Sequence, residues 1–204
     1  MKTLWPWACV IVAVVGCAGA RPVADIPVTQ QSIIPGTGQS VNRNGKPLPL
    51  EGTPFRVGQQ LPAAILTAAD LTLVKLTETQ GKVRIISVVP SLDTRVCEQQ
   101  THRLSEQNGG LDRRAQLITV SMDLPYAQAR FARAAKIDNV LFLSDHVAAE
   151  FGRATGLLIT PLRLLTRAVL VVDRDNVIRY AQVVPELGQL PDLQQAFAAA
   201  QRLL

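Results

Sequence analysis

The 204-residue sequence contains little of what several classes of protein require. It has two histidines, His102 and His146, which stand too far apart to indicate a metal site, so we predict no metal and no cofactor. The net charge is +5, but the arginines are spread along the chain and form no run that would follow a phosphate backbone. We therefore expect no nucleic-acid binding. The low aromatic and moderate charged fractions are typical of one ordinary α/β domain.

The apolar run near the N-terminus, Leu4 to Val15, has roughly a dozen residues, short of the ~20 needed to span a bilayer. It follows Lys2 and is typical of an export signal. Val14-Val15-Gly16-Cys17 resembles the lipobox of bacterial lipoproteins, in which the cysteine becomes the acylated first residue. We therefore expect a signal peptide over residues 1–16 and a lipid anchor at Cys17, on a membrane facing the periplasm. Ala18-Gly19-Ala20 offers the alternative of ordinary cleavage, which would leave a soluble periplasmic protein.

The sequence has three cysteines, and export leaves one of them free. Cys9 lies in the discarded segment, and Cys17 is either acylated or discarded. Cys97 then has no partner for an internal disulfide, so it is either an inert buried residue or a reactive one. The dithiol chemistry of thioredoxin-like reductases needs Cys-x-x-Cys, and Thr94 occupies the first of those positions.

The remaining chain divides by composition into a tether and a domain. Residues 17–40 are predicted to form a flexible tether, since 21–40 are rich in Pro, Gln, Thr, Gly and Ser without periodicity. Residues 41–204 are predicted to form the domain. It opens with a β-hairpin, because Asn44-Gly45 is a strong turn signal.

Apolar runs alternate with helical patterns through the domain, which predicts an α/β fold with a central mixed sheet flanked by helices. The order of elements is that of a thioredoxin-like fold of the peroxiredoxin type. We expect strands at 83–89, 116–122 and 140–143, a hairpin of 168–172 with 177–184, and helices at 94–107, from Pro125, around 147–154 and after Asp192.

Two of these helices have predicted buried faces. The helix over 94–107 is polar, and its one coherent inward face is Cys97, Thr101 and Leu104. The helix that begins at Pro125 has the stripe Leu124, Ala127, Phe131 and Ala134.

Cys97 follows a predicted central strand and lies in the first turn of a predicted helix. The unpaired N–H groups and positive dipole end of a helix N-terminus favour a thiolate over a thiol. Chemistry in open α/β sheets gathers at the carboxyl ends of strands, where this turn belongs.

Pro90-x-x-x-Thr94-x-x-Cys97 after an apolar strand resembles the active-site motif of peroxiredoxins. From about Val41 to Leu204 the chain is similar to one subgroup, the bacterial thiol peroxidases, in 89–94, 123–131 and 166–173. The resemblance implies a peroxidase with four site residues. Cys97 would attack the peroxide, Thr94 would hydrogen-bond the thiolate and the peroxide, Pro90 would shield the pocket from water, and Arg167 would supply a cation beside the sulfur.

The chain departs from this family at Ala132, where a second, resolving cysteine usually follows the phenylalanine. We therefore predict a one-cysteine mechanism, in which hydrogen peroxide or an organic hydroperoxide oxidises Cys97 to a sulfenic acid. An external small thiol or a thioredoxin-like protein would then reduce it. The resemblance also implies a homodimer, with Tyr126 and Phe131 in the core or at the dimer contact.

Plainer interpretations exist for each of these residues. A lone cysteine is commonly buried and inert, Arg167 could be a strand-end charge facing water, and Thr94 could be a helix cap alone. Asp93 and Glu98 would oppose a thiolate if they were close, so we expect them to face outward. The rival functions are a non-catalytic thioredoxin-like lipoprotein and a thiol-disulfide oxidoreductase.

Overall fold

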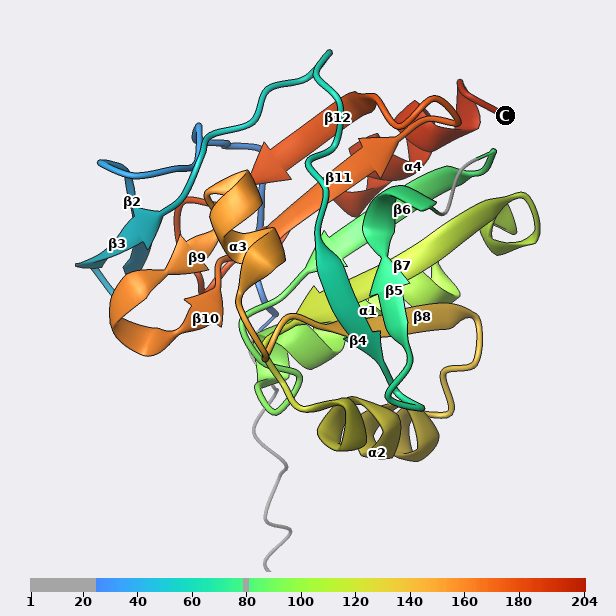
Figure 1. Cartoon of the computed structure of the whole chain (residues 1–204), viewed down its shortest axis with the longest axis horizontal. Helices are drawn as coiled ribbons and strands as arrows, with labels where there is room; N and C mark the ends of the chain where they lie inside the picture. Colours follow the sequence, from blue (N-terminus) through green and yellow to red (C-terminus); the bar gives the residue numbers. More distant parts are fainter. Residues whose placement is uncertain (1–24, 79–80) are drawn as a thin grey trace, which may run out of the picture.

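The structure is a computed structural model that describes residues 25–78 and 81–204. A seven-stranded mixed sheet lies at its centre (Figure 1). Its strands follow the order β12 (Ile178–Val183), β11 (Ala168–Val172), β6 (Val83–Val88), β7 (Ala115–Ser121), β8 (Val140–Ser144), β4 (Ile65–Ala68) and β5 (Leu73–Lys75). β6, β7 and β8 are parallel, and the other pairs are antiparallel.

The central strands form where the sequence is continuously apolar and β-branched. All six residues of β6 are buried, as are all five of β11, because both faces of the sheet are covered. The mixed central sheet of a peroxiredoxin-type fold is confirmed. The short strands β4 and β5, of which β5 forms the edge of the sheet, lie in a stretch for which the sequence predicted no element.

Helices cover the two faces of the sheet unequally. α1 (Arg95–Glu106), α2 (Pro125–Ala135) and α4 (Leu193–Gln201) pack on one face, and the short α3 (Glu150–Thr155) packs on the other (Figure 1). In the part of the chain that the structure describes, 3₁₀ turns complete the helical elements at η1 (Leu76–Glu78), η2 (Leu111–Arg113) and η3 (Thr160–Leu162). The predicted inward face of α1 is confirmed, since Cys97, Thr101 and Leu104 are buried.

The predicted stripe of α2 is wrong in part. Leu124 is 56 % exposed and Ala134 is also exposed, whereas Gln128 is completely buried. The amide of Gln128 donates to the Ser121 hydroxyl and to the Leu143 carbonyl, which satisfies its polar hydrogens against the sheet. The buried face of α2 is therefore centred on a polar residue, Gln128. Hydrophobic periodicity alone had placed only apolar residues on that face.

The N-terminal hairpin is confirmed, with strands β2 (Ser40–Arg43) and β3 (Lys46–Glu51). Asn44 and Gly45 both have positive φ, 52° and 75°, as a tight two-residue hairpin turn requires. β3 also pairs with β9 (Leu158–Ile159), which pairs with β10 (Leu164–Leu165), so the hairpin belongs to a second, four-stranded sheet.

The predicted tether does not extend through residues 25–40, because this segment is packed on the domain. Ile26 is buried, and β1 (Val28–Thr29) pairs in parallel with β13 (Leu190–Pro191). The Gln182 amide donates to the carbonyls of Thr29 and Gln31. These long-range contacts order a segment whose composition is typical of a linker. The predicted signal peptide and Cys17 lie outside the described residues, within which no helix is long and apolar enough to span a bilayer.

Asp145 gives the fold a pH dependence that can be measured. Its buried carboxylate accepts the N–H groups of Phe151 and Gly152 at the start of α3, at 3.1 and 2.8 Å. Burial raises the pKa of Asp145 from 3.8 to about 6, although these N–H bonds oppose the rise. The folded state therefore binds a proton more tightly than the unfolded chain. The resulting stabilisation is full below the unfolded pKa and is lost as the pH rises through the folded pKa.

We expect Asp145→Asn to remove this dependence, because an amide does not titrate. On going from near pH 7.5 to about pH 4.5, the wild type should gain roughly 2 kcal/mol in unfolding free energy relative to the variant. Urea unfolding of both proteins at the two pH values measures the difference. If the unfolding free energies of the two proteins differed by the same amount at both pH values, Asp145 would not be the source of the pH dependence.

Candidate active site

Cys97 lies where the sequence predicted, at the third residue of the helix that follows the central strand. β6 ends at Val88, the loop 89–94 follows, and Thr94 occupies the N-cap position of α1 in an extended conformation. The first N–H groups of a helix have no carbonyl partner within it, so the helix presents its positive end around Cys97. The side chain of Cys97 is completely buried.

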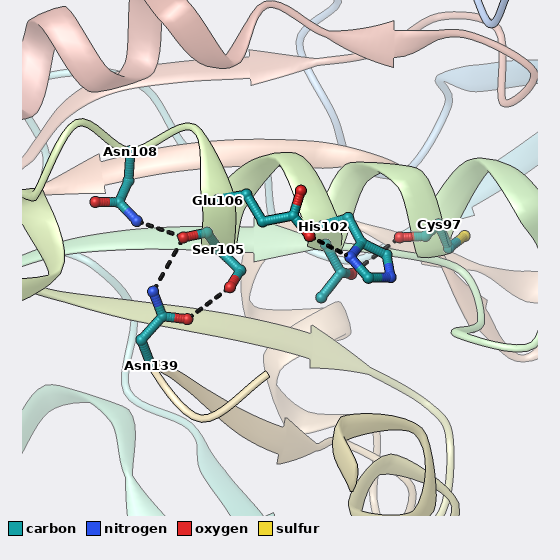
Figure 2. A network of polar contacts seen from close by, with 7 residues as sticks. Cys97, His102, Ser105, Glu106, Asn108 and Asn139 are labelled. Atoms are coloured by element: carbon teal, nitrogen blue, oxygen red, sulfur yellow. Dashed lines mark hydrogen bonds and ion pairs between the residues drawn. The ribbon is translucent and has the colours of Figure 1, made fainter. Parts of the chain in front are cut away.

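The opposite end of α1 is tied to the rest of the domain. Figure 2 shows Cys97 at the N-terminal end of the helix and a polar network at its C-terminal end. There the Ser105 hydroxyl donates to the side-chain oxygen of Asn139 at 2.7 Å, and the Asn139 amide donates to the Ser105 carbonyl at 3.0 Å. Asn139 immediately precedes β8, so these bonds fix the helix against the sheet.

Arg167 contacts the sulfur directly. One Nη of its guanidinium lies 3.3 Å from Cys97 Sγ, and the side chain is only 2 % exposed. The guanidinium also donates to the Leu187 carbonyl at 3.2 and 3.1 Å and to Gln100 Oε1 at 2.7 Å. Within the described residues it forms no ion pair with a carboxylate. Its positive charge is therefore held by neutral acceptors and remains available to stabilise negative charge on sulfur.

Gln100 is a site residue that the sequence analysis missed. It lies one helical turn after Cys97 and is completely buried. Its amide nitrogen donates to the Ser87 hydroxyl at 2.8 Å and to the Ala168 carbonyl at 3.3 Å, which leaves Oε1 to accept from Arg167. Gln100 is three residues after Cys97, a spacing that places both on the same helix face. Because the predicted helix is polar throughout, nothing else in the sequence distinguished Gln100 as a site residue.

The N-terminal hairpin supports Arg167 from the other side. The Asn42 N–H donates to the Pro185 carbonyl at 2.7 Å, and the Leu187 N–H donates to the Asn42 carbonyl at 2.8 Å. The Glu186 carboxylate accepts the N–H groups of Asn44 and Gly188. The hairpin thus fixes the short segment whose Leu187 carbonyl holds the guanidinium.

A pocket of about 200 Å³ lies beside the Cys97 sulfur. Arg167 connects the two, since its side chain lines the pocket and also contacts Cys97 Sγ. Pro90 and Thr94 line it as well, so the structure brings all four predicted site residues together. Much of the remaining wall is apolar, and the hairpin supplies part of the rim. The other lining residues are Arg43, Asn44, Ser91, Val96, Leu162, Leu164, Leu187 and Gly188.

The Thr94 hydroxyl does not make the predicted bond to the sulfur. It donates instead to the Ser91 carbonyl at 3.0 Å, and it makes no side-chain cap bond to α1. Thr94 is therefore a cap in its backbone conformation only. With its proton directed to Ser91, its oxygen retains lone pairs that can accept a hydrogen bond.

The remaining predictions around the site are of mixed outcome. Asp93 and Glu98 are exposed, as expected. Tyr126 is 67 % exposed and therefore is not a core residue, whereas Phe131 is half-buried and packs edge-to-face on Phe142. Cys97 is the one cysteine in the described residues, and Ala132 packs against the same large apolar cluster to which Cys97 belongs.

Comparison with known proteins identifies the family of the chain. Residues 56–197 match the Redoxin family model. The chain is 41 % identical over 165 residues to a thiol peroxidase of Halalkalibacterium halodurans, covering 81 % of this chain and 99 % of that protein. It is 43 % identical over 159 residues to a thiol peroxidase of Streptococcus pneumoniae, covering 78 % and 97 % of the two chains.

A solved structure also resembles the whole domain. The crystal structure of a peroxiredoxin-like protein from Aquifex aeolicus superposes with a TM-score of 0.75 at 33 % identity, covering 83 % of this chain and 99 % of that one. The family model, the curated relatives and the solved structure agree with one another. The chain belongs to the redoxin family, in its thiol peroxidase group, and is a thiol-dependent peroxidase.

Proposed function

We propose that this enzyme reduces hydroperoxides by a one-cysteine mechanism centred on Cys97. The Cys97 thiolate attacks the hydroxyl oxygen of ROOH, so that an S–O bond forms as the O–O bond breaks. Sulfur is oxidised to the sulfenic acid, and the alkoxide that leaves takes up a proton to become ROH or, from hydrogen peroxide, water. The observation that carries this proposal is the 3.3 Å contact between Cys97 Sγ and the Arg167 guanidinium.

In this mechanism three residues assist the sulfur. Arg167 stabilises the thiolate and the negative charge that passes to the departing oxygen. Thr94 accepts a hydrogen bond from the hydroperoxide O–H, since its own proton is directed to Ser91. Pro90, which lines the pocket and has no N–H of its own, keeps water from the sulfur. The apolar wall of the pocket would contact the alkyl group of an organic hydroperoxide.

The second half of the cycle is assigned to an external thiol. A thiolate attacks the sulfenic sulfur and forms a mixed disulfide, while the hydroxide that leaves takes up a proton to become water. A second thiol then attacks that disulfide and restores Cys97 as a thiolate. Support comes from Ala132, which occupies the position of the usual resolving cysteine. The reductant would be a small thiol or a thioredoxin-like protein.

We further propose that the enzyme is exported, anchored to a membrane through acylated Cys17 facing the periplasm, and active as a homodimer. The support for the anchor is the lipobox-like Val14-Val15-Gly16-Cys17. The support for the dimer is the family resemblance, together with Leu124 and Tyr126, which leave apolar surface exposed close in sequence to Asp123, the residue that contacts the loop 89–94.

Cys97→Ser should abolish peroxide consumption, because an alcohol is not ionised at neutral pH and cannot attack the O–O bond. The assay follows hydrogen peroxide and cumene hydroperoxide with dithiothreitol as reductant, and a sulfenic-acid reagent should label Cys97 in the oxidised wild type. Cys17→Ser is the matched control and should retain full consumption. Equal inactivity of the wild type and the Cys97 variant would contradict a peroxidase.

Arg167→Gln should slow oxidation of Cys97 by roughly 10²- to 10³-fold, because the charge that stabilises the thiolate and the leaving oxygen is lost. Stopped-flow measurement gives the rate of peroxide reaction, and alkylation by iodoacetamide reports the thiolate population. The control Arg163→Gln removes an exposed arginine from the turn before β10 and should leave both rates unchanged. Similar rates in the Arg167 variant and the wild type would refute the role.

Cys17→Ala should release the expressed protein from the membrane fraction, because a single small substitution removes the acylation site. Detergent-phase partitioning of cell extracts, with immunodetection of the protein, makes the comparison. Cys9→Ala is the matched control and should remain in the membrane fraction. A wild type found wholly in the aqueous phase would favour cleavage at Ala18-Gly19-Ala20.

A further inference from the structure

Asp123 makes an unusual set of contacts beside the active-site loop. It lies two residues beyond the end of β7 and is half-buried. Its Oδ1 accepts the Ser91 hydroxyl at 2.7 Å, while Oδ2 accepts both the Leu92 N–H and the Ser121 hydroxyl at 2.8 Å. Within the described part of the chain it forms no ion pair. Its two oxygens are therefore committed to three donors.

Two of these donors belong to the loop that carries the proposed chemistry. Ser91 and Leu92 lie between Pro90 and Thr94, and the pocket beside the sulfur is lined by Pro90, Ser91 and Thr94. The loop starts on a main-chain bond, Val89 N–H to the Val120 carbonyl at 3.0 Å. Asp123 provides the next attachment, from the end of the adjacent parallel strand.

Ser91 links this attachment to Thr94. Its hydroxyl donates to Asp123, and its carbonyl accepts the Thr94 hydroxyl at 3.0 Å. If Ser91 shifted, the Thr94 proton would lose its acceptor and could rotate toward the sulfur or the peroxide. The lone pairs of Thr94 would then no longer face an incoming O–H. Asp123 thus reaches the hydroxyl through two hydrogen bonds without touching the substrate pocket itself.

We propose that Asp123 is a positioning residue of the peroxidase reaction, which holds Ser91 and Leu92 in place and thereby orients the Thr94 hydroxyl for the hydroperoxide. The proposal rests on the peroxidase mechanism given above. A carboxylate is needed because both of its oxygens accept. An amide would turn one acceptor into a donor that faces the donors of the loop.

Asp123→Asn separates alignment of the peroxide from ionisation of the sulfur. Oxidation of Cys97 by cumene hydroperoxide should slow by roughly 10- to 100-fold, while alkylation by iodoacetamide, which needs no Thr94, should change by less than about threefold. Asp93→Asn is the matched control. It removes the same charge from an exposed position in the same loop and should leave both rates unchanged.

Coupling to Thr94 provides the second readout. Thr94→Val should slow oxidation strongly in the wild type and far less in the Asp123→Asn background, because the two residues act through the same hydroxyl. Ser91→Ala removes one arm of the same link and should give the same pattern, so it serves as the test should the Asp123 variant fail to fold.

Three results would overturn the proposal. These are an unchanged oxidation rate in Asp123→Asn, a parallel fall of oxidation and alkylation, or additive effects of the Asp123 and Thr94 substitutions. An unreactive wild-type Cys97 would instead overturn the peroxidase mechanism and this proposal with it. A reactive wild type with an equally reactive Asp123 variant would overturn the positioning role alone.

Discussion

The contact between the Arg167 guanidinium and the Cys97 sulfur is the constraint around which the rest of the site is arranged. Both groups are removed from water, and a buried cation is costly unless it is paired or hydrogen-bonded. Gln100 and the Leu187 carbonyl supply acceptors that solvate the guanidinium without neutralising it. In the proposed mechanism the Cys97 thiolate supplies the counter-charge. A carboxylate in place of those acceptors would take up the charge and leave the sulfur with little of it.

The sheet brings these residues together from distant parts of the chain. β11 is antiparallel to β6, and the register pairs Ala168 with Val88. Arg167 therefore lies just before the paired strand, beside the point where the chain leaves β6 for the Cys97 loop. The second sheet positions Leu187 near Arg167, because the main chain of Asn42 in the hairpin hydrogen-bonds to the segment that contains Leu187. A hairpin that looks peripheral in the topology is thus linked to the Cys97 sulfur through three successive hydrogen bonds, by way of Leu187 and Arg167.

The parts of the fold that the sequence could predict are those set by local patterns. Continuous apolar β-branched runs marked the central strands, and Asn44-Gly45 marked the hairpin, because such a turn needs positive φ at both residues. The docking of residues 25–40 could not be predicted from composition, since it depends on distant partners such as Gln182. Gln128 and Gln100 were missed for a related reason. Each is a buried amide whose partners lie on strands, and periodicity of apolar residues does not report such partners.

The spacing of Pro90, Thr94 and Cys97 predicted that these side chains would lie together, but it did not predict their orientations. In the structure the Thr94 hydroxyl donates its hydrogen bond to the Ser91 carbonyl. The role proposed for Thr94 therefore changes from hydrogen-bond donor to hydrogen-bond acceptor.

Because Ala132 offers no second thiol, the proposed cycle needs an external thiol to reach the Cys97 sulfur. In the proposed cycle the sulfenic acid forms on a completely buried sulfur, and a thiol must then approach along the axis of the S–O bond. A small thiol can enter through the pocket beside Arg167, which leaves the loop 89–94 closed. A protein thiol is too bulky for that route, and in the proposed cycle it would reach the buried sulfur only if the loop left Asp123, whose carboxylate accepts the Leu92 N–H. In the proposed cycle, the bonds that orient Thr94 for oxidation would then slow reduction by a protein thiol. A small thiol would avoid that conflict.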